Sequence, residues 1–188
     1  GASESAVLMG LSSYASLIEL WGIKSGRIQE GEEPETDRQL WGLRLEPLVA
    51  EEYGRRTKRR LERCAKLLRS TKWPFMLATP DYFTSDELPP YSNRAPDMPL
   101  EIKTTDFHRR GDWKDGPPER VIVQLQHQMA VTGATRASAG VLVGGNKFYW
   151  ADVPRDDAMI GQIVSACEKF WQQVRTETLP PVASEQNT

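Results

Sequence analysis

The chain has 188 residues, of which 39% are apolar and 27% charged, a balance typical of one globular domain and not of a disordered segment. Twenty-four basic and 26 acidic side chains leave a formal charge of −2, so bulk charge does not identify a nucleic-acid binder. No apolar run reaches the roughly 18–20 residues that cross a bilayer. Two cysteines exclude a four-thiolate metal site, so any metal is expected on carboxylates.

Apolar residues at helical spacing predict three helices in the first third of the chain. The first is short, with Ser3 or Ser5 as its cap and Gly10 as its end. The second is expected over residues 13–24 and the third over residues 36–53. The main apolar face of the third helix is formed by Trp41, Leu45, Leu48 and Val49.

A strongly basic run follows the third helix. Residues 55–69 hold eight basic side chains and one acidic one, and the leucines among them favour a strand. A solvated charged strand is the commoner reason for such a run, and a phosphate-binding face is the alternative. Another short strand is expected over residues 75–79, before a turn at Pro80–Asp81, and a polar, proline-rich loop over 85–99.

The last half of the chain alternates strands and helices. The expected elements are a strand at 100–104, a helix from Pro117 to Gly133, a hairpin of 140–143 with 148–152, and a helix after Pro154. We expect one domain over residues 1–179 and a loose tail over 180–188.

The six tryptophans, with Met9 and Met76, are most simply core residues. For Trp21 and Tyr14, near the amino terminus, a second role remains an alternative, because a nucleobase could stack there.

Asp81, Glu101 and Lys103 form the pattern most indicative of chemistry. In a strand, residues two apart share a face, so Glu101 and Lys103 face one way while Leu100 and Ile102 face the other. A preceding turn can bring Asp81 beside Glu101, and two such carboxylates repel unless a divalent cation such as Mg²⁺ neutralises them. The alternative is an ordinary Glu–Lys pair on an exposed strand, because this spacing often occurs by accident.

Glu46 lies on the third expected helix, and its neighbours one turn away are small or apolar. A carboxylate in such surroundings is unfavourable unless it is paired or binds a metal. The residues alone leave open a metal ligand or a salt bridge, to Arg44 or to an arginine of the basic run.

Gln124 lies one helical turn from His127 and Gln128, so the three can form a polar stripe. An uncharged amide can hold a water or a phosphate oxygen without competing for a metal. The alternative is a helix face that is merely hydrated, and His127 alone is more often hydrogen-bonded than a ligand.

Taken in order, six segments resemble the phage lambda exonuclease or YqaJ-like viral recombinase family of PD-(D/E)xK nucleases. The likeness extends over nearly the whole chain, and segments that are weak alone are specific in series. They are residues 1–4, 10–14, 41–47, 78–81, 100–103 and 124–129.

The resemblance implies a magnesium-dependent exonuclease that digests one strand of linear double-stranded DNA from its 5′ end. It also implies an α/β (α+β) fold with a restriction-endonuclease-like core, in which a central mixed β-sheet is flanked by helices. A homotrimer ring and a 3′ overhang handed to a single-strand annealing recombinase are implied as well. The expected setting is the cytoplasm of a bacterial host of a phage or prophage, with no membrane partner. An endonuclease or a non-catalytic DNA-binding or assembly protein on the same fold remains an alternative.

The resemblance also assigns roles at the metal centre. Asp81 and Glu101 would bind Mg²⁺, for which Mn²⁺ can substitute, with the backbone carbonyl of Ile102 as a further ligand. Lys103 would act on the attacking water. Glu46 would hold a second metal or its waters.

Outside the metal centre, the resemblance assigns Gln124 to placing the nucleophile, and Ser3 and Thr79 to the terminal 5′-phosphate. Tyr82 and Val121 stand where the family commonly has glycine and tyrosine, and the family's end-binding arginine would precede the first residue. These departures concern end recognition and loop shape more than the metal ligands.

Overall fold

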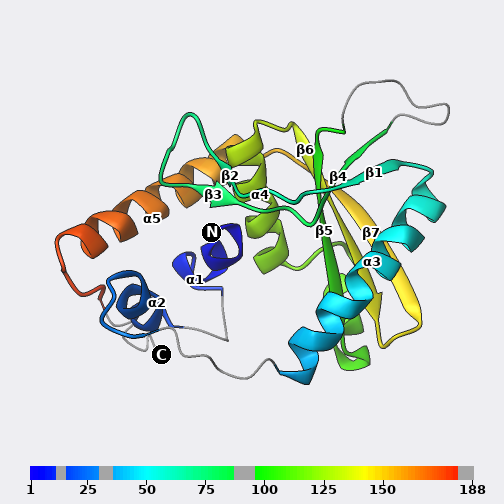
Figure 1. Cartoon of the computed structure of the whole chain (residues 1–188), viewed down its shortest axis with the longest axis horizontal. Coiled ribbons are helices and arrows are strands. Elements are labelled where there is room, and N and C mark those ends of the chain that lie inside the picture. Colours follow the sequence, from blue (N-terminus) through cyan, green and yellow to red (C-terminus); the bar gives the residue numbers. More distant parts are fainter. Residues whose placement is uncertain (12–15, 30–35, 87–95, 182–188) are drawn as a thin grey trace.

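A computed structural model describes residues 1–11, 16–29, 36–86 and 96–181 of the chain. Its centre is a five-stranded mixed sheet in the order β1-β4-β5-β6-β7 (Figure 1). β5 and β6 are parallel, and the other neighbours are antiparallel. The strands are β1 (Arg60–Arg63), β4 (Tyr82–Ser85), β5 (Met98–Thr105), β6 (Arg136–Val143) and β7 (Lys147–Pro154).

Helices cover both faces of this sheet (Figure 1). α3 (Asp37–Thr57) packs on one face, and α4 (Glu119–Thr132) and α5 (Asp157–Arg175) pack on the other. α4 is also the crossover that the parallel pair β5 and β6 requires. The arrangement confirms the predicted fold class of a central mixed sheet flanked by helices. None of the described helices is long and apolar enough to span a membrane.

α4 is the element on which distant parts of the chain converge. The N-terminal elements η1 (Ala2–Glu4) and α1 (Ser5–Leu8) both contact it, whereas α2 (Leu17–Lys24) contacts α5. The ladder of β2 (Leu68–Arg69) and β3 (Leu77–Ala78) contacts α4 as well. The sheet and the N-terminal segment therefore lie on either side of one helix.

The predicted helices are present with shifted ends. α2 begins at Leu17 because the Ser16 side chain caps it, and residues 13–15 of the expected helix lie outside the described part. α3 starts with a capping box between Thr36 and Gln39 and runs past its expected end to Thr57. It stops where Lys58 adopts a left-handed φ of 62°. Residues 182–188 of the expected tail are also outside the described residues.

The basic run does not form one strand, which corrects the prediction. Its first residues complete α3, and the rest divides between β1 and β2, which belong to different sheets because they pair with β4 and β3. The strand expected over 75–79 is reduced to β3. β4 and the 3-10 helix η2 (Phe107–Trp113) were not predicted, since each is short and lacks a clear apolar period.

Two of the tryptophans are not core residues: Trp41 is 55% and Trp150 44% exposed. Leu48, expected on the buried face of α3, is 60% exposed, because the helix turns a neighbouring stripe to the sheet. That stripe consists of Val49, Ala50 and Tyr53. Trp21 is buried and donates its indole N–H to a backbone carbonyl of α5, so it is not available for base stacking. Tyr14 lies outside the described residues.

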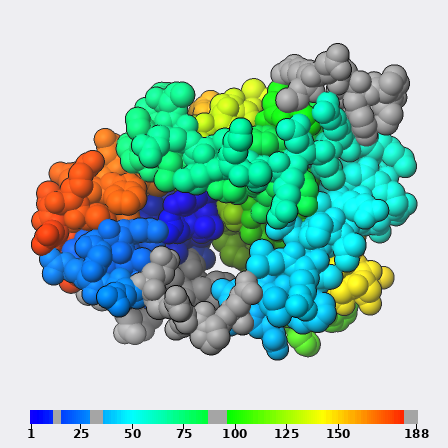
Figure 2. Space-filling model, in the orientation of Figure 1, coloured from blue at the N-terminus to red at the C-terminus, as the bar shows by residue number. Residues whose placement is uncertain are grey.

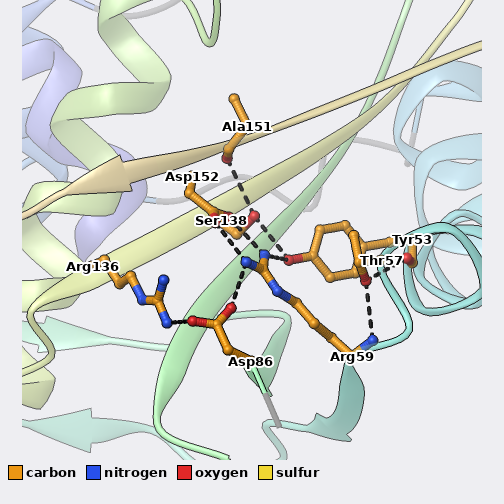
Figure 3. Close-up of polar contacts among 8 residues, drawn as sticks. All are labelled: Tyr53, Thr57, Arg59, Asp86, Arg136, Ser138, Ala151 and Asp152. Atoms are coloured by element: carbon orange, nitrogen blue, oxygen red, sulfur yellow. Dashed lines mark hydrogen bonds and ion pairs between the residues drawn. The ribbon is translucent and has the colours of Figure 1, made fainter. Parts of the chain in front are cut away.

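Arg59 ties the end of α3 to the far strands of the sheet (Figure 3). Its guanidinium donates to both carboxylate oxygens of Asp152 at 2.6 and 2.7 Å and to the Tyr53 hydroxyl at 2.7 Å. It also pairs with Asp86 at 2.6 Å, and the Tyr53 hydroxyl donates to Ser138 Oγ at 3.0 Å. These contacts fix the position of α3 against β6 and β7.

Candidate active site

Asp81, Glu101 and Lys103 lie together on neighbouring strands at the centre of the sheet. β5 turns Glu101 and Lys103 away from α3, while Leu100 and Ile102 pack against it, as the alternation predicts. Asp81 directly precedes β4, and its Oδ2 accepts a hydrogen bond from the backbone N–H of Ile102 at 2.7 Å. The structure therefore brings the aspartate beside the strand that carries the glutamate.

Glu101 is only 4% exposed, and its carboxylate accepts three hydrogen bonds. Lys103 Nζ and Gln124 Nε2 donate to Oε1 at 2.5 and 2.7 Å. Gln128 Nε2 donates to Oε2 at 2.7 Å. A buried carboxylate is unfavourable unless its lone pairs are satisfied, so these donors both offset the burial and fix the direction of the carboxylate.

Glu46 reaches the same place from α3. Its side chain is 17% exposed, and Arg63 Nη2 of β1 lies 3.9 Å from its Oε1. The two interpretations left open by the sequence are therefore both compatible with its position. Arg63 is 72% exposed and holds Glu46 weakly, so it leaves the carboxylate free to face the cavity.

These side chains line one cavity of about 730 Å³ between α3 and the sheet. Its wall includes Glu46, Asp81, Glu101 and Lys103, together with Arg38. Figure 2 shows a hollow on this face of the molecule, between the N-terminal elements in blue and α3 in cyan. The carboxylates thus face a space that a large substrate can reach.

Burial and neighbouring negative charge raise the pKa of Asp81 to about 7. Desolvation is the largest cause, and the Glu101 and Glu46 carboxylates add to it, against the Ile102 N–H and Lys103, which lower the pKa. The carboxylates therefore repel one another as they stand. A divalent cation between them would relieve this repulsion.

Lys103 carries positive charge at neutral pH. Burial lowers its pKa, but the Glu101 carboxylate, through its charge and its hydrogen bond, and Asp81 more than offset this and raise the pKa above the usual value. The side chain is therefore a hydrogen-bond donor and an electrostatic partner of Glu101 in this state.

The donor set suits a hard divalent cation, although it is not closed around one. No group of three or more His, Cys, Asp or Glu side chains is gathered tightly enough to hold a metal among the described residues. The cavity is nevertheless lined by the carboxylates of Glu46, Asp81 and Glu101, and carboxylate oxygens are ligands that Mg²⁺ prefers while keeping several waters.

Ser3 and Thr79 are exposed and lie on segments that meet at α4. Ser3 belongs to η1, and Thr79 directly follows β3; both elements contact α4. Ser5, two residues beyond Ser3, bonds to His127 of α4 through Oγ and Nδ1 at 2.5 Å. The structure thus brings both segments to the helix that also carries Gln124.

The sequence places Gln128 in a polar stripe but does not predict that it contacts Glu101. Gln128 is fully buried and contacts Glu101 directly. The available signal was its spacing of one helical turn from Gln124. His127, in the same stripe, bonds to Ser5 and does not contact the carboxylates.

The fold resembles those of solved exonucleases. The alkaline exonuclease LHK-Exo from Laribacter hongkongensis has a TM-score of 0.72 at 22% identity, over 94% of this chain and 88% of that chain. LHK-Exo in complex with dAMP has a TM-score of 0.73 at 21% identity with the same coverage. A phage related exonuclease from Haemophilus somnus 129PT has a TM-score of 0.62 at 13% identity, over 94% of each chain. At these identities the likeness concerns the fold alone.

Sequence comparison identifies the family. The uncharacterized protein YqaJ of Bacillus subtilis (strain 168) is 33% identical over 174 residues, which are 91% of this chain and 51% of YqaJ. The chain thus spans about half the length of this relative. Residues 1–135 match the YqaJ-like viral recombinase domain. With Asp81, Glu101 and Lys103 assembled on this fold, the chain belongs to the YqaJ-like viral recombinase family.

Proposed function

We propose that the protein is a magnesium-dependent exonuclease that degrades one strand of linear double-stranded DNA in the 5′ to 3′ direction. The observation that carries the proposal is the convergence of Asp81, Glu101 and Lys103 on one cavity, in a chain with the fold of alkaline exonucleases. LHK-Exo has been solved with dAMP, a 5′-mononucleotide of the kind that such a reaction releases.

In this proposal Asp81, Glu101 and the Ile102 carbonyl hold the metal, and Glu46 holds a second metal or its waters. A bound divalent cation would lower the pKa of the attacking water and stabilise the charge that develops on the phosphodiester. The protein supplies the placement of these oxygens, which the hydrogen bonds to Glu101 and Asp81 restrict to one orientation.

Lys103 and Gln124 then orient the nucleophile. Both share Glu101 Oε1 as acceptor, so both can turn a donor toward a water or a phosphate oxygen near that atom. The ammonium group of Lys103 also offsets the negative charge that accumulates on the phosphate. Gln124 contributes without adding charge.

We further propose that Ser3 and Thr79 contact the terminal 5′-phosphate and that the protein works as a homotrimer ring. The 3′ overhang that it leaves would be the substrate of a single-strand annealing recombinase, in the cytoplasm of a phage host. The meeting of both segments at α4, beside Gln124, supports the first of these assignments.

The test is magnesium-dependent degradation of linear duplexes labelled at either end. We expect mononucleotide release from 5′-phosphorylated ends, with 5′-hydroxyl ends cut more slowly and closed circles left intact. Rapid cutting of circles would instead assign an endonuclease.

Glu101→Ala should abolish cleavage, because it removes the acceptor shared by Lys103, Gln124 and Gln128, while duplex binding is retained. Glu51→Ala, on the exposed face of α3, is the matched control and should cleave normally. If Glu101→Ala cuts as fast as the native chain, the proposed mechanism is wrong. If neither the native chain nor Glu101→Ala cuts duplex but both bind it, the protein is a non-catalytic DNA-binding member of the family.

A further inference from the structure

A second cavity, of about 260 Å³, adjoins the carboxylate cavity and is lined by cations. We call it the cation cavity. Its lining residues are Arg38, Lys103, Thr104, Thr105, Arg109, Trp113, Arg120 and Val121. It shares Arg38, Lys103 and Thr104 with the carboxylate cavity, so the two are continuous.

The chain assembles these cations from four elements. Arg38 lies in the first turn of α3, Lys103 in β5, Arg109 in η2, and Arg120 in the first turn of α4. η2 and the start of α4 follow β5 in the chain, so the strand that carries Glu101 leads directly into the cavity wall. The first turn of a helix of this length adds a favourable field for an anion.

Lys103 pairs with Glu101, but the positive charge of the three arginines of the cation cavity is only weakly compensated. Among the described residues, Asp112 is the carboxylate within ion-pair distance of Arg109 and Arg120, at 3.8 and 4.0 Å. Arg38 pairs with the exposed Asp106, and both side chains are more than half exposed, so solvent screens that pair. No acidic residue is among those that line the cavity. Clustered cations with partial exposure attract an anion that can replace their water.

The cavity is smaller than the roughly 300–1,000 Å³ of typical small-molecule sites, so it suits a phosphate group better than a whole nucleotide. Arginine guanidinium groups bind phosphate oxygens in pairs of parallel hydrogen bonds. Thr105, on the same face of β5 as Lys103, adds a further hydroxyl at the wall. The ligand class is therefore a phosphate monoester or diester.

The residues of α4 give the position of the cation cavity relative to the rest of the site. Arg120 lies at the cavity, Gln124 bonds to Glu101, and His127 bonds to Ser5, next to Ser3. At 1.5 Å of rise per residue, Arg120 and Gln124 are about 6 Å apart along the helix axis. Along the helix, Gln124 therefore lies between the cation cavity at Arg120 and the N-terminal segment at His127.

We propose that the cation cavity binds a backbone phosphate of the cut strand, on the 3′ side of the scissile phosphate. This inference rests on the proposed 5′ to 3′ polarity, which puts the terminal phosphate at Ser3 and Thr79 and the remaining strand at Arg120. Holding that phosphate keeps the shortened strand in place after each cut. The phosphate group of a released 5′-mononucleotide is the other ligand that this cavity could bind.

The test compares duplex binding by the native chain, Arg120→Gln and Arg109→Gln. The probe is a 5′-phosphorylated duplex in EDTA, with or without an uncharged methylphosphonate at the second linkage from the 5′ end. Losing a charge-assisted contact should weaken binding of the normal probe by Arg120→Gln about tenfold. The slope of log Kd against log salt should also fall by about one. The methylphosphonate should weaken the native chain equally and Arg120→Gln no further.

Arg110→Gln is the matched control, because Arg110 is the neighbour of Arg109 on η2 but bonds to Tyr149 and does not line the cavity. It should bind as the native chain does. Arg109→Gln gives an independent reading if Arg120→Gln melts at a lower temperature.

A parallel titration with dAMP separates the two sources. Weaker dAMP binding by Arg120→Gln, with unchanged duplex binding, would keep the phosphate site but overturn the backbone assignment in favour of the released nucleotide. Unchanged binding of both probes by both variants overturns the proposal. Because none of these measurements needs cleavage, failure of the nuclease assay would refute the proposed function without deciding the cavity.

Discussion

Gln128 shows how much of the site depends on single hydrogen bonds. It is fully buried, its amide N–H₂ donates to Glu101, and its Oε1 has no hydrogen-bond partner among the described residues. Such a group is retained at a cost in stability, which indicates that its contact with Glu101 is what matters. We infer that Gln128 is a positioning residue that acts through Glu101.

Gln128→Met keeps the volume of the side chain and removes the donor to Glu101 Oε2. The carboxylate then has one unsatisfied oxygen and can rotate, so we expect the Mg²⁺ concentration for half-maximal cleavage to rise several-fold. Gln126→Met is the control on the same helix. It loses bonds to Pro154 and Asp156, which join α4 to the start of α5, and should lower stability without changing metal dependence. Equal metal dependence in both variants would refute the positioning role.

His127 makes the stability of the protein sensitive to acid. Burial is the largest cause that lowers its pKa from 6.5 to about 4. Between pH 6.5 and 4 the unfolded chain binds more protons at His127 than the folded chain does. The free energy of unfolding is therefore unaffected by His127 above pH 6.5 and decreases as the pH falls toward 4. At about 1.4 kcal/mol per pKa unit, His127 should account for a loss of about 2 kcal/mol between pH 7 and 4.5.

Urea unfolding at pH 7 and 4.5 measures this contribution. In His127→Gln the difference between the two pH values should shrink by that amount, because no imidazole remains to be protonated. His108→Gln removes a histidine from the surface and should leave the difference as in the native chain. An unchanged difference in His127→Gln would show that other groups set the acid sensitivity.

At the scale of elements, α3 is held against the sheet by its buried apolar stripe and, at its C-terminal end, by the polar network of Arg59. Arg59→Met removes the partner of Asp152, Asp86 and Tyr53 at a site where the arginine side chain is 13% exposed. Leaving carboxylates without their cation should lower the free energy of unfolding by about 2 kcal/mol. Chemical denaturation measures this directly.

The control is Arg55→Met, from the same basic run. Arg55 pairs with Glu52 one turn away and its side chain is 65% exposed, so its removal should lie within the error of the measurement. Equal losses in the two variants would mean that the network in Figure 3 does not anchor α3.

The ion pairs of the basic run, residues 55–69, could not be read from the sequence. Its arginines pair within the fold: Arg55 and Arg56 with Glu52, Arg59 with Asp86 and Asp152, and Arg63 with Glu46. Four of the eight basic side chains of the run are thus in ion pairs within the described part of the chain, which favours the structural interpretation over a continuous phosphate-binding face. The less conspicuous Arg38, Arg109 and Arg120, scattered in the sequence, meet in the cation cavity.

At the scale of the whole molecule, a formal charge of −2 has to be reconciled with the proposed binding of DNA. The cation cavity offers local positive charge beside the carboxylates, and a ring would place several such cavities around one duplex. We therefore expect sedimentation to give the mass of a trimer. We also expect that protein already bound to labelled duplex completes its degradation after dilution into unlabelled competitor duplex. A monomeric mass over the working concentrations would exclude the ring.

Periodicity was sufficient to predict the helices and the strand pair around the hairpin, because each buries one continuous face. It was also sufficient for the placement of Glu101 and Lys103 on one face of β5. The ends of α3, the division of the basic run and the exposure of Trp41 and Trp150 could not be predicted in this way. They depend on which neighbour each segment meets, and that neighbour is distant in the chain.

The sequence by itself determined the α-helices, the strands β5, β6 and β7, the fold class and the family, because local spacing and ordered motifs carry that information. Only the tertiary structure decided that Gln128 holds Glu101, that Arg63 approaches Glu46, and that three separated arginines share one cavity. Hydrogen bonds and charge interactions act over a few ångströms. Their partners here come from segments tens of residues apart, which only the packing of α3, α4 and η2 around β5 brings within reach.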